Sequence, residues 1–243
     1  MNTFTSPYDQ VISRKRRWTP VAVQAGKLVE GSEESIRRAL GLRHLELPVR
    51  EFLQQGLEKE LPKTAGVVEA LKSNQMDEER HDQALNYVVE AHGTDSKSEA
   101  EAKHILKAWL DAPEHPILKA AILERSVFFV ILPFFRFNGD IGIRTTASDI
   151  SRDEQCHTAI HAMVCSELGI KSTQSLNRLR RATVAWVMDG LGSSENKYLD
   201  KDFWMRQSDN LYSQGKAPEL SETQRSRMPA FFEAANTDLP QYG

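Results

Sequence analysis

Three pairs of glutamate and histidine are the residues of this sequence best placed to do chemistry. In each pair the histidine follows the glutamate by three positions, and the pairs are Glu78/His81, Glu101/His104 and Glu154/His157. On an α-helix this spacing puts both side chains on one face, where a carboxylate and an imidazole can bind the same metal ion. The sequence therefore contains three candidate parts of a metal centre.

The apolar residues around each pair indicate which pairs face a hydrophobic core. At about 100° per residue, Glu78 and His81 share a helix face with apolar residues at positions 67, 71, 85 and 89. Glu154 and His157 share a face with apolar residues at 150, 164 and 168. The middle pair lies off the apolar stripe of its helix, so we expect it at the surface. Two buried pairs are costly unless a cation neutralises them; two independent salt-bridged core pairs are the other interpretation.

A centre with two metal ions takes a further carboxylate from each of two other helices. Glu124 opens a strongly apolar stretch, and it lies as far before position 139 as Glu154 lies after it. A turn at 139 would place these two side chains opposite each other in an antiparallel hairpin. The same argument pairs Glu46 with Glu78 about a turn at position 62. Glu51 is the competitor in the first helix, but it falls on that helix's polar face.

Composition excludes several functional classes. The chain has 243 residues and a formal net charge of −3, which gives no electrostatic footprint for nucleic acid, and we expect the basic cluster at 14–17 to be a solvated arm. No N-terminal stretch resembles a signal peptide, and the longest apolar run, 127–135, is too short to span a bilayer. We therefore expect a cytoplasmic protein that binds neither nucleic acid nor membrane. Cys156 and Cys165 are expected to be free thiols.

The spacing of apolar residues predicts an all-α bundle. Helices are expected at 32–60 with a kink at Pro48, at about 67–92, from a capping box at Ser96 and Glu99 to before Pro113, from Pro116 to the turn at 138–140, and at about 141–168, 173–191 and 197–213. We divide the chain into an N-terminal arm (1–31), a helical bundle (32–213) and a C-terminal tail (214–243).

Two segments resemble a known family, the small (beta) subunit of class I ribonucleotide reductase. Residues 123–130, Leu-Glu-Arg-Ser-Val-Phe-Phe-Val, are similar to the helix that carries one of that family's metal ligands. Residues 150–157, Ile-Ser-Arg-Asp-Glu-Gln-Cys-His, are similar to its Ile-x-Arg-Asp-Glu-x-x-His signature. The resemblance implies a ferritin-like helical bundle with a di-metal carboxylate core.

The resemblance also implies roles for individual residues. It implies two metal ions, iron or manganese, held by Glu46, Glu78, His81, Glu124, Glu154 and His157. Asp153, which orients a ligand histidine, and Trp18 would belong to a path for radical transfer, and Tyr242 would take the place of the family's tail tyrosine. Phe128 and Ile150 would line the apolar pocket beside the metals. The implied partners are a large subunit, which reduces the ribonucleotide, and a second copy of the chain in a homodimer.

One departure from the family pattern bears on function. The radical tyrosine of the family lies one turn after the first ligand histidine, where this chain has Leu85, and Tyr87 nearby points to another face. The oxidising equivalent is then expected to stay on the metals. A stand-alone di-metal oxygenase or oxidase is the alternative function, and a metal-storing or structural bundle is a third. His161, one turn after His157 on the same face, is expected to be a core residue or a residue that supports a ligand, rather than a seventh ligand.

Overall fold

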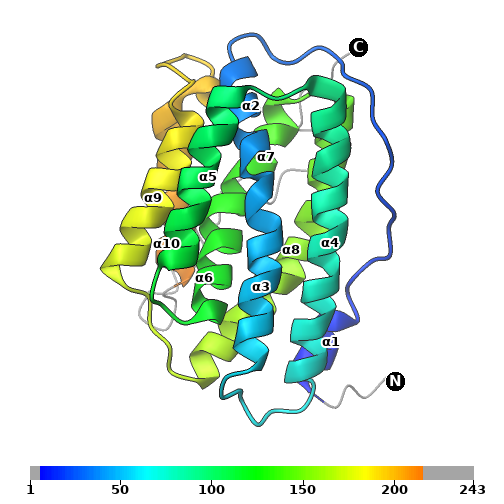
Figure 1. The fold of residues 1–243 in the computed structure, drawn as a ribbon, viewed down its shortest axis with the longest axis vertical. Helices are drawn as coiled ribbons and strands as arrows, with labels where there is room; N and C mark the ends of the chain where they lie inside the picture. The colour runs from blue at the N-terminus through cyan, green and yellow to red at the C-terminus, as the bar shows by residue number, and fades with distance from the viewer. Residues whose placement is uncertain (1–5, 216–243) are drawn as a thin grey trace.

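The computed structural model describes residues 6–215, and this part of the chain folds as helices without strands (Figure 1). The expected all-α class is confirmed. The α-helices are α1 (Pro7–Ile12), α2 (Glu33–Gly41), α3 (Glu46–Leu57), α4 (Val67–His92), α5 (Ser96–Asp111), α6 (Pro116–Leu123), α7 (Phe129–Asn138), α8 (Ile141–Glu167), α9 (Gln174–Met188) and α10 (Lys201–Gly215). Two short 3₁₀ segments, η1 (Leu42–Leu45) and η3 (Lys197–Leu199), and one π-helical turn, η2 (Glu124–Phe128), complete the described chain.

Four long helical segments form the bundle that positions the candidate site. α3 packs on α4, α4 packs on α8, and α8 packs on the continuous segment made of α6, η2 and α7. The α6 part of this segment packs on α3 and closes the bundle. α5, α9 and α10 cover the side of this bundle opposite α4 (Figure 1). No described helix combines the length and apolar character needed to cross a membrane.

The first expected helix is interrupted, and the interruption lies before Pro48 rather than at it. The chain forms α2, tightens into η1 at Leu42–Leu45, and resumes as α3 at Glu46. A proline ring clashes with the carbonyl four residues earlier, which here belongs to His44 inside η1. Pro48 itself is accommodated in the first turn of α3, where its missing N–H costs little. The irregular turn directly precedes Glu46.

Two other helix starts differ from the sequence prediction. Asp95, not Ser96, caps α5, because its Oδ2 accepts the backbone N–H of Ser98 at 2.8 Å. The expected helix at 197–213 is divided: η3 ends before Asp200, whose side chain accepts the N–H of Phe203 at 2.6 Å and starts α10. In both places an aspartate satisfies a free N–H of the first helical turn.

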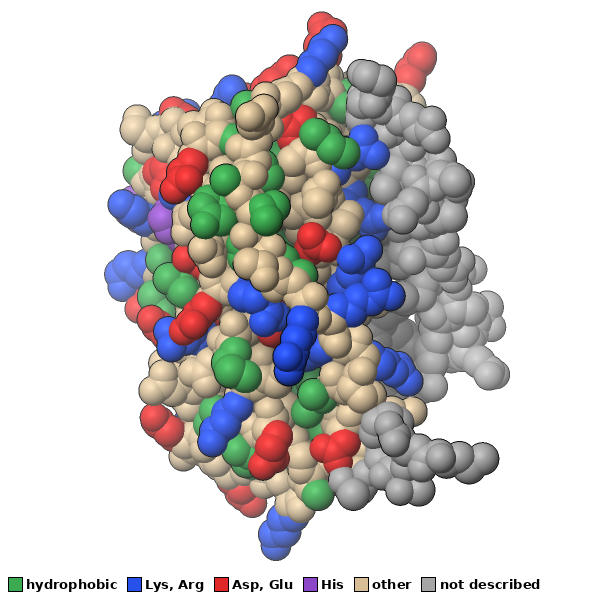
Figure 2. All heavy atoms as spheres, turned by 90° about the vertical axis from the view of Figure 1, so that its right-hand side faces the viewer, with side chains coloured by type: hydrophobic (Ala, Val, Ile, Leu, Met, Phe, Trp, Pro, Cys, Tyr) green, Lys and Arg blue, Asp and Glu red, His purple; other side chains and the backbone are tan. Residues whose placement is uncertain are grey.

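The N-terminal arm contains a short helix that the sequence analysis did not anticipate. α1 packs on α4 and α8, and its buried Tyr8 donates a hydrogen bond to Glu167 at 2.7 Å. The chain then runs in an extended form along the side of α4 to α2 (Figure 1). Lys and Arg side chains gather in the middle of this face (Figure 2). Within the basic cluster Arg14, Arg16 and Arg17 are exposed, whereas Lys15 turns inward.

Candidate metal centre

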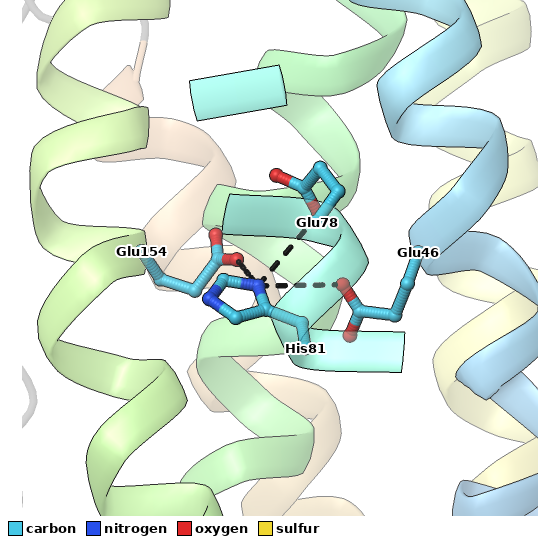
Figure 3. Close-up of side chains that lie close together, drawn as sticks. All are labelled: Glu46, Glu78, His81 and Glu154. Carbon is cyan, nitrogen blue, oxygen red and sulfur yellow. Dashed lines mark ion pairs between the residues drawn. The ribbon is translucent and has the colours of Figure 1, made fainter. Parts of the chain in front are cut away.

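Six buried side chains from the four segments of the bundle meet at its centre. They form two groups, in each of which one ligand atom per residue lies within 4.8 Å of the others. The His81 group consists of Glu46, Glu78, His81 and Glu154, and the His157 group consists of Glu78, Glu124, Glu154 and His157. Figure 3 shows the His81 group, with its three carboxylates directed at the imidazole. Glu78 and Glu154 belong to both groups, so each would be shared by the two sites.

Local irregularities of the backbone present two of the carboxylates. Glu46 is the first residue of α3, directly after η1. Glu124 opens the π-helical turn η2, at which the helix made of α6 and α7 widens by one residue. Such π turns occur frequently at functional sites. Both carboxylates are at most 2% exposed, and they face the regular helices α4 and α8 that carry the other four residues.

The polar atoms at the centre fit a pair of metal ions. Buried ligand atoms without a hydrogen-bond partner include Glu46 Oε2, both oxygens of Glu78, Glu124 and Glu154, and Nδ1 of His81 and His157. Burying such atoms is costly unless they are paired or coordinate a metal. Four carboxylates carry four negative charges, which two divalent cations would neutralise. The mixed set of carboxylates and imidazoles suits iron or manganese.

The two histidines are oriented by carboxylates behind them. His81 points Nδ1 at Glu154 Oε1, 3.2 Å away, while its Nε2 lies 3.3 Å from Asp153 Oδ2. His157 points Nδ1 at Glu78 Oε1, 3.1 Å away, while its Nε2 lies 3.0 Å from Asp77 Oδ2. A carboxylate that accepts the Nε2–H of an imidazole leaves the Nδ1 lone pair free to bind a metal. Both imidazoles therefore present Nδ1 to the centre.

Without metal ions, several ligand groups of the centre have raised pKa values and bind protons that metal ions would displace. Burial strongly raises the pKa of Glu46. Burial acts in the same direction on Glu78, but the neighbouring imidazoles of His157 and His81 outweigh it and lower the pKa of Glu78 to about 2. Burial would lower the pKa values of both histidines, yet the surrounding carboxylates raise them well above the usual value. Because ligands bind metals in their deprotonated forms, metal binding at this site releases protons.

A hydrogen-bonded chain connects the His81 group to the N-terminal arm. Trp18 donates its indole N–H to Asp153 Oδ2 at 2.8 Å, and the same oxygen lies 3.3 Å from His81 Nε2. The Trp18 ring stacks near the His81 ring, with centroids 6.2 Å apart and planes at 18°. Arg80 lies over the Trp18 ring at 5.7 Å and contacts Asp153 Oδ2 at 3.2 Å. Trp18 is half-buried, so this chain reaches from the buried centre toward the surface.

The structure separates the other residues singled out in the sequence. Glu51 is exposed, and Glu46 is the carboxylate of α3 that joins the cluster. In the third glutamate–histidine pair, which was expected at the surface, His104 is exposed and Glu101 accepts a hydrogen bond from Trp186 at 2.7 Å.

Three apolar positions near the ligands are in the core. Phe128, Ile150 and Leu85 belong to the buried hydrophobic cluster and are at most 6% exposed. Cys156 and Cys165 are free, as expected. Tyr242 lies outside the described residues, so its role remains a prediction.

Sequence reasoning missed the role of Asp77. Asp77 on α4 contacts His157 on α8, just as Asp153 on α8 contacts His81 on α4. The chain repeats Asp-Glu-x-x-His at 77–81 and 153–157, and this repeat is the signal that could have identified Asp77. Lys15, whose Nζ lies 2.6 Å from Asp77 Oδ2, had no comparable signal because it comes from the extended arm.

Comparisons with known proteins support the fold and leave the family open. No protein-family model matches the chain, and no curated protein matches it. Among solved structures, the chain is similar to a crystal structure described as a "putative class I ribonucleotide reductase" from Bacillus halodurans. The identity is 16%, the match covers 95% of both chains, and the TM-score is 0.56. This likeness, over nearly the whole of both chains, supports the helical bundle and its order of helices.

Proposed function

We propose that this chain is the radical-generating small subunit of a class I ribonucleoside-diphosphate reductase. In this proposal a di-metal centre is oxidised and is coupled by radical transfer to a large subunit that makes deoxyribonucleotides. The observation that carries the proposal is the chain from Trp18 through Asp153 to His81. A metal-storing or structural bundle has no need of an oxidisable indole joined by hydrogen bonds to a ligand histidine.

The residues around the centre have separate tasks in this function. Glu46, Glu78, His81, Glu124, Glu154 and His157 would hold the two ions. Bound iron or manganese would supply the one-electron oxidising equivalent. Buried Phe128 and Ile150 exclude water from the centre. Leu85 stands where a tyrosine could be oxidised and cannot take that role, so the oxidising equivalent would stay with the bound ions. Trp18 and Asp153 would form the path from the centre outward.

The partners belong to the same proposal. The neighbour's description as a "putative class I ribonucleotide reductase" supports a large subunit as the partner. The homodimer is proposed from the family resemblance alone. Trp18 is half-buried where the arm meets α4 and α8, because its indole contacts Asp153 on α8 and Arg80 of α4 lies over its ring. The large subunit would receive the radical there. Tyr242 would extend the path in the C-terminal tail.

The test is a reductase assay with the metal-loaded chain and a large subunit from the same source. Wild-type chain should support ribonucleoside-diphosphate reduction only when both subunits are present. Trp18→Phe keeps an aromatic ring but removes the indole N–H, so it should reduce turnover to background while metal content stays at two ions per chain. Absence of stimulation by the large subunit would refute the proposal.

Trp186 provides a matched control. It is also half-buried, and it also donates its indole N–H to a carboxylate, Glu101 Oε2, at 2.7 Å. This pair lies away from the metal centre, so Trp186→Phe should leave reductase turnover unchanged. Equal losses in Trp18→Phe and Trp186→Phe would show that the Trp18 effect is structural.

Leu85 favours a second candidate, a stand-alone di-metal oxygenase or oxidase. An enzyme that oxidises its own substrate needs no tyrosine to store a hole for a partner, and the buried, apolar Leu85 lies one helical turn after His81 on α4. This function predicts oxygen consumption with an apolar substrate such as a fatty acid or aldehyde, without any second protein. A fatty acid that copurifies with the chain would favour it over the reductase.

A further inference from the structure

A third buried histidine, His161, lies next to His157, one of the two candidate ligand histidines. The ring centroids of His81 and His157 are 5.6 Å apart, and those of His157 and His161 are 6.3 Å apart. All three side chains are completely buried. His161 Nδ1 lies 2.6 Å from Glu124 Oε2, a shorter distance than either candidate ligand histidine makes to a glutamate of the centre.

The partner behind the ring differs between His161 and the other two. Behind His81 and His157 a carboxylate oxygen faces Nε2, whereas behind His161 the amide nitrogen of Asn74 faces Nε2 at 3.1 Å. Asparagine oxygen and nitrogen are distinguished by their hydrogen-bond partners. Lys15 Nζ, which can only donate, lies 2.7 Å from Asn74 Oδ1. The oxygen of Asn74 therefore faces Lys15, and its NH₂ group faces His161.

This arrangement determines where His161 carries its proton. The Asn74 NH₂ group donates to Nε2, so Nε2 must be the unprotonated nitrogen of the ring. The proton is then on Nδ1, which lies in close contact with Glu124 Oε2, 2.6 Å away. His81 and His157 have the opposite arrangement, with Nε2–H bound to a carboxylate and Nδ1 available to a metal. A ring that carries its proton on Nδ1 cannot bind a metal through that atom.

We propose that His161 is a positioning residue for Glu124 and that Lys15, through Asn74, sets its tautomer. His161 holds Glu124 Oε2, which leaves Oε1, 3.5 Å from His157 Nδ1, to face the centre. Glu124 is thereby restricted to one rotamer and to binding through one oxygen. The inference rests on the metal centre of the proposed function, but it requires neither the large subunit nor radical chemistry.

The tautomer can be measured directly in the full-length, metal-free chain labelled with ¹⁵N-histidine. Long-range ¹H–¹⁵N correlation spectra distinguish a ring protonated at Nδ1 from one protonated at Nε2, and loss of signals in His161→Gln assigns the ring. We expect wild-type His161 to be protonated at Nδ1 only. A proton on Nε2 in the wild type would overturn the proposal.

Two neighbouring variants test the path from Lys15. Asn74→Asp replaces the donor behind the ring with an acceptor of the same shape, so Nε2 of His161 should gain a proton. Ser73→Ala removes another acceptor of Lys15, 2.9 Å from its Nζ, without changing what faces His161, so it should preserve the wild-type pattern. An unchanged pattern in Asn74→Asp, or an altered one in Ser73→Ala, would contradict control of the tautomer by Asn74.

Metal titration tests whether the N–H group of His161 affects the affinity of the centre for Mn²⁺. Titration with Mn²⁺, followed by the electron paramagnetic resonance of the free ion, should show affinity at one site falling about 10- to 100-fold in His161→Leu, in the range found when groups that orient ligands are removed. His161→Gln retains an N–H donor and should recover most of that affinity. Equal losses in the two variants would refute a role for the contact between His161 and Glu124. Neither measurement uses reductase activity, so a failed reductase assay leaves this result independent.

Discussion

The His81 group and the His157 group share a sequence pattern, but different side chains contact the residues that orient their ligands. Each histidine ends an Asp-Glu-x-x-His segment, and the aspartate of each segment orients the histidine of the other. Behind the His81 group, Asp153 accepts an indole N–H from Trp18. Behind the His157 group, Asp77 accepts a hydrogen bond from the ammonium group of Lys15, and His161 contacts Glu124.

This difference suggests a division of labour between two similar halves. An indole can be oxidised and can conduct an electron, whereas an ammonium group can only hold charge and donate hydrogen bonds. The side of the centre with Trp18 is suited to exchange with a partner. The side with Lys15 and His161 is suited to keep its ligands in place.

The largest effect is expected where the two groups overlap. Glu78→Gln keeps the shape of the side chain but removes a negative charge that both groups share, so manganese content should fall from two ions per chain toward none. Glu101→Gln is the matched control on α5, where it should leave two ions bound. Metal analysis after dialysis measures both. Retention of two ions in Glu78→Gln would show that the groups do not share this ligand.

The next effect separates the groups. Glu46 belongs only to the His81 group and Glu124 only to the His157 group. Glu46→Gln and Glu124→Gln should each lower manganese content to about one ion per chain, since each removes a charged ligand from one site. The exposed Glu51 serves as the control, and Glu51→Gln should bind two ions. Loss of an ion in Glu51→Gln, with none in Glu46→Gln, would reverse the assignment of the α3 carboxylate.

A smaller effect should distinguish the aspartates behind the histidines. Asp153→Asn and Asp77→Asn should each weaken Mn²⁺ binding by about 10- to 100-fold, because the ligand histidine loses its orienting carboxylate. At saturating metal, only Asp153→Asn should still reduce turnover with the large subunit, since Asp77 does not contact Trp18. Isothermal titration and the reductase assay measure the two effects. Equal turnover at saturation in both variants would contradict separate tasks for the two halves.

The smallest effect concerns stability rather than metal. Lys15 donates to Ser73, Asn74 and Asp77, and its side chain is 10% exposed. Lys15→Met keeps the length of the side chain but loses these charged hydrogen bonds, so the free energy of unfolding of the metal-free chain should fall by about 2 kcal/mol. Urea denaturation measures it, with Arg14→Met as an exposed control. A change below about 0.5 kcal/mol would show that the contacts of Lys15 do not stabilise the packing of the arm on α4.

The candidate ligands could be predicted from the sequence because helices repeat regularly. The spacing of Glu78/His81 and Glu154/His157, together with the apolar stripes around them, placed both pairs on buried faces. Equal distance from the two turns paired Glu46 with Glu78 and Glu124 with Glu154. The structure brings these six residues together at the centre of the bundle.

Only the tertiary structure decided what stands behind the ligands. Lys15 and Trp18 reach the centre through an extended arm whose path no helical period describes, and the π-helical turn at Glu124 has no signature in the hydrophobic pattern. Which ring nitrogen of His161 carries the proton depends on whether the oxygen or the nitrogen of the Asn74 amide faces Lys15, 59 residues away in the chain. Local periodicity determines which side chains share a helix face. Hydrogen-bond partners from distant segments determine the protonation and orientation those side chains adopt once buried.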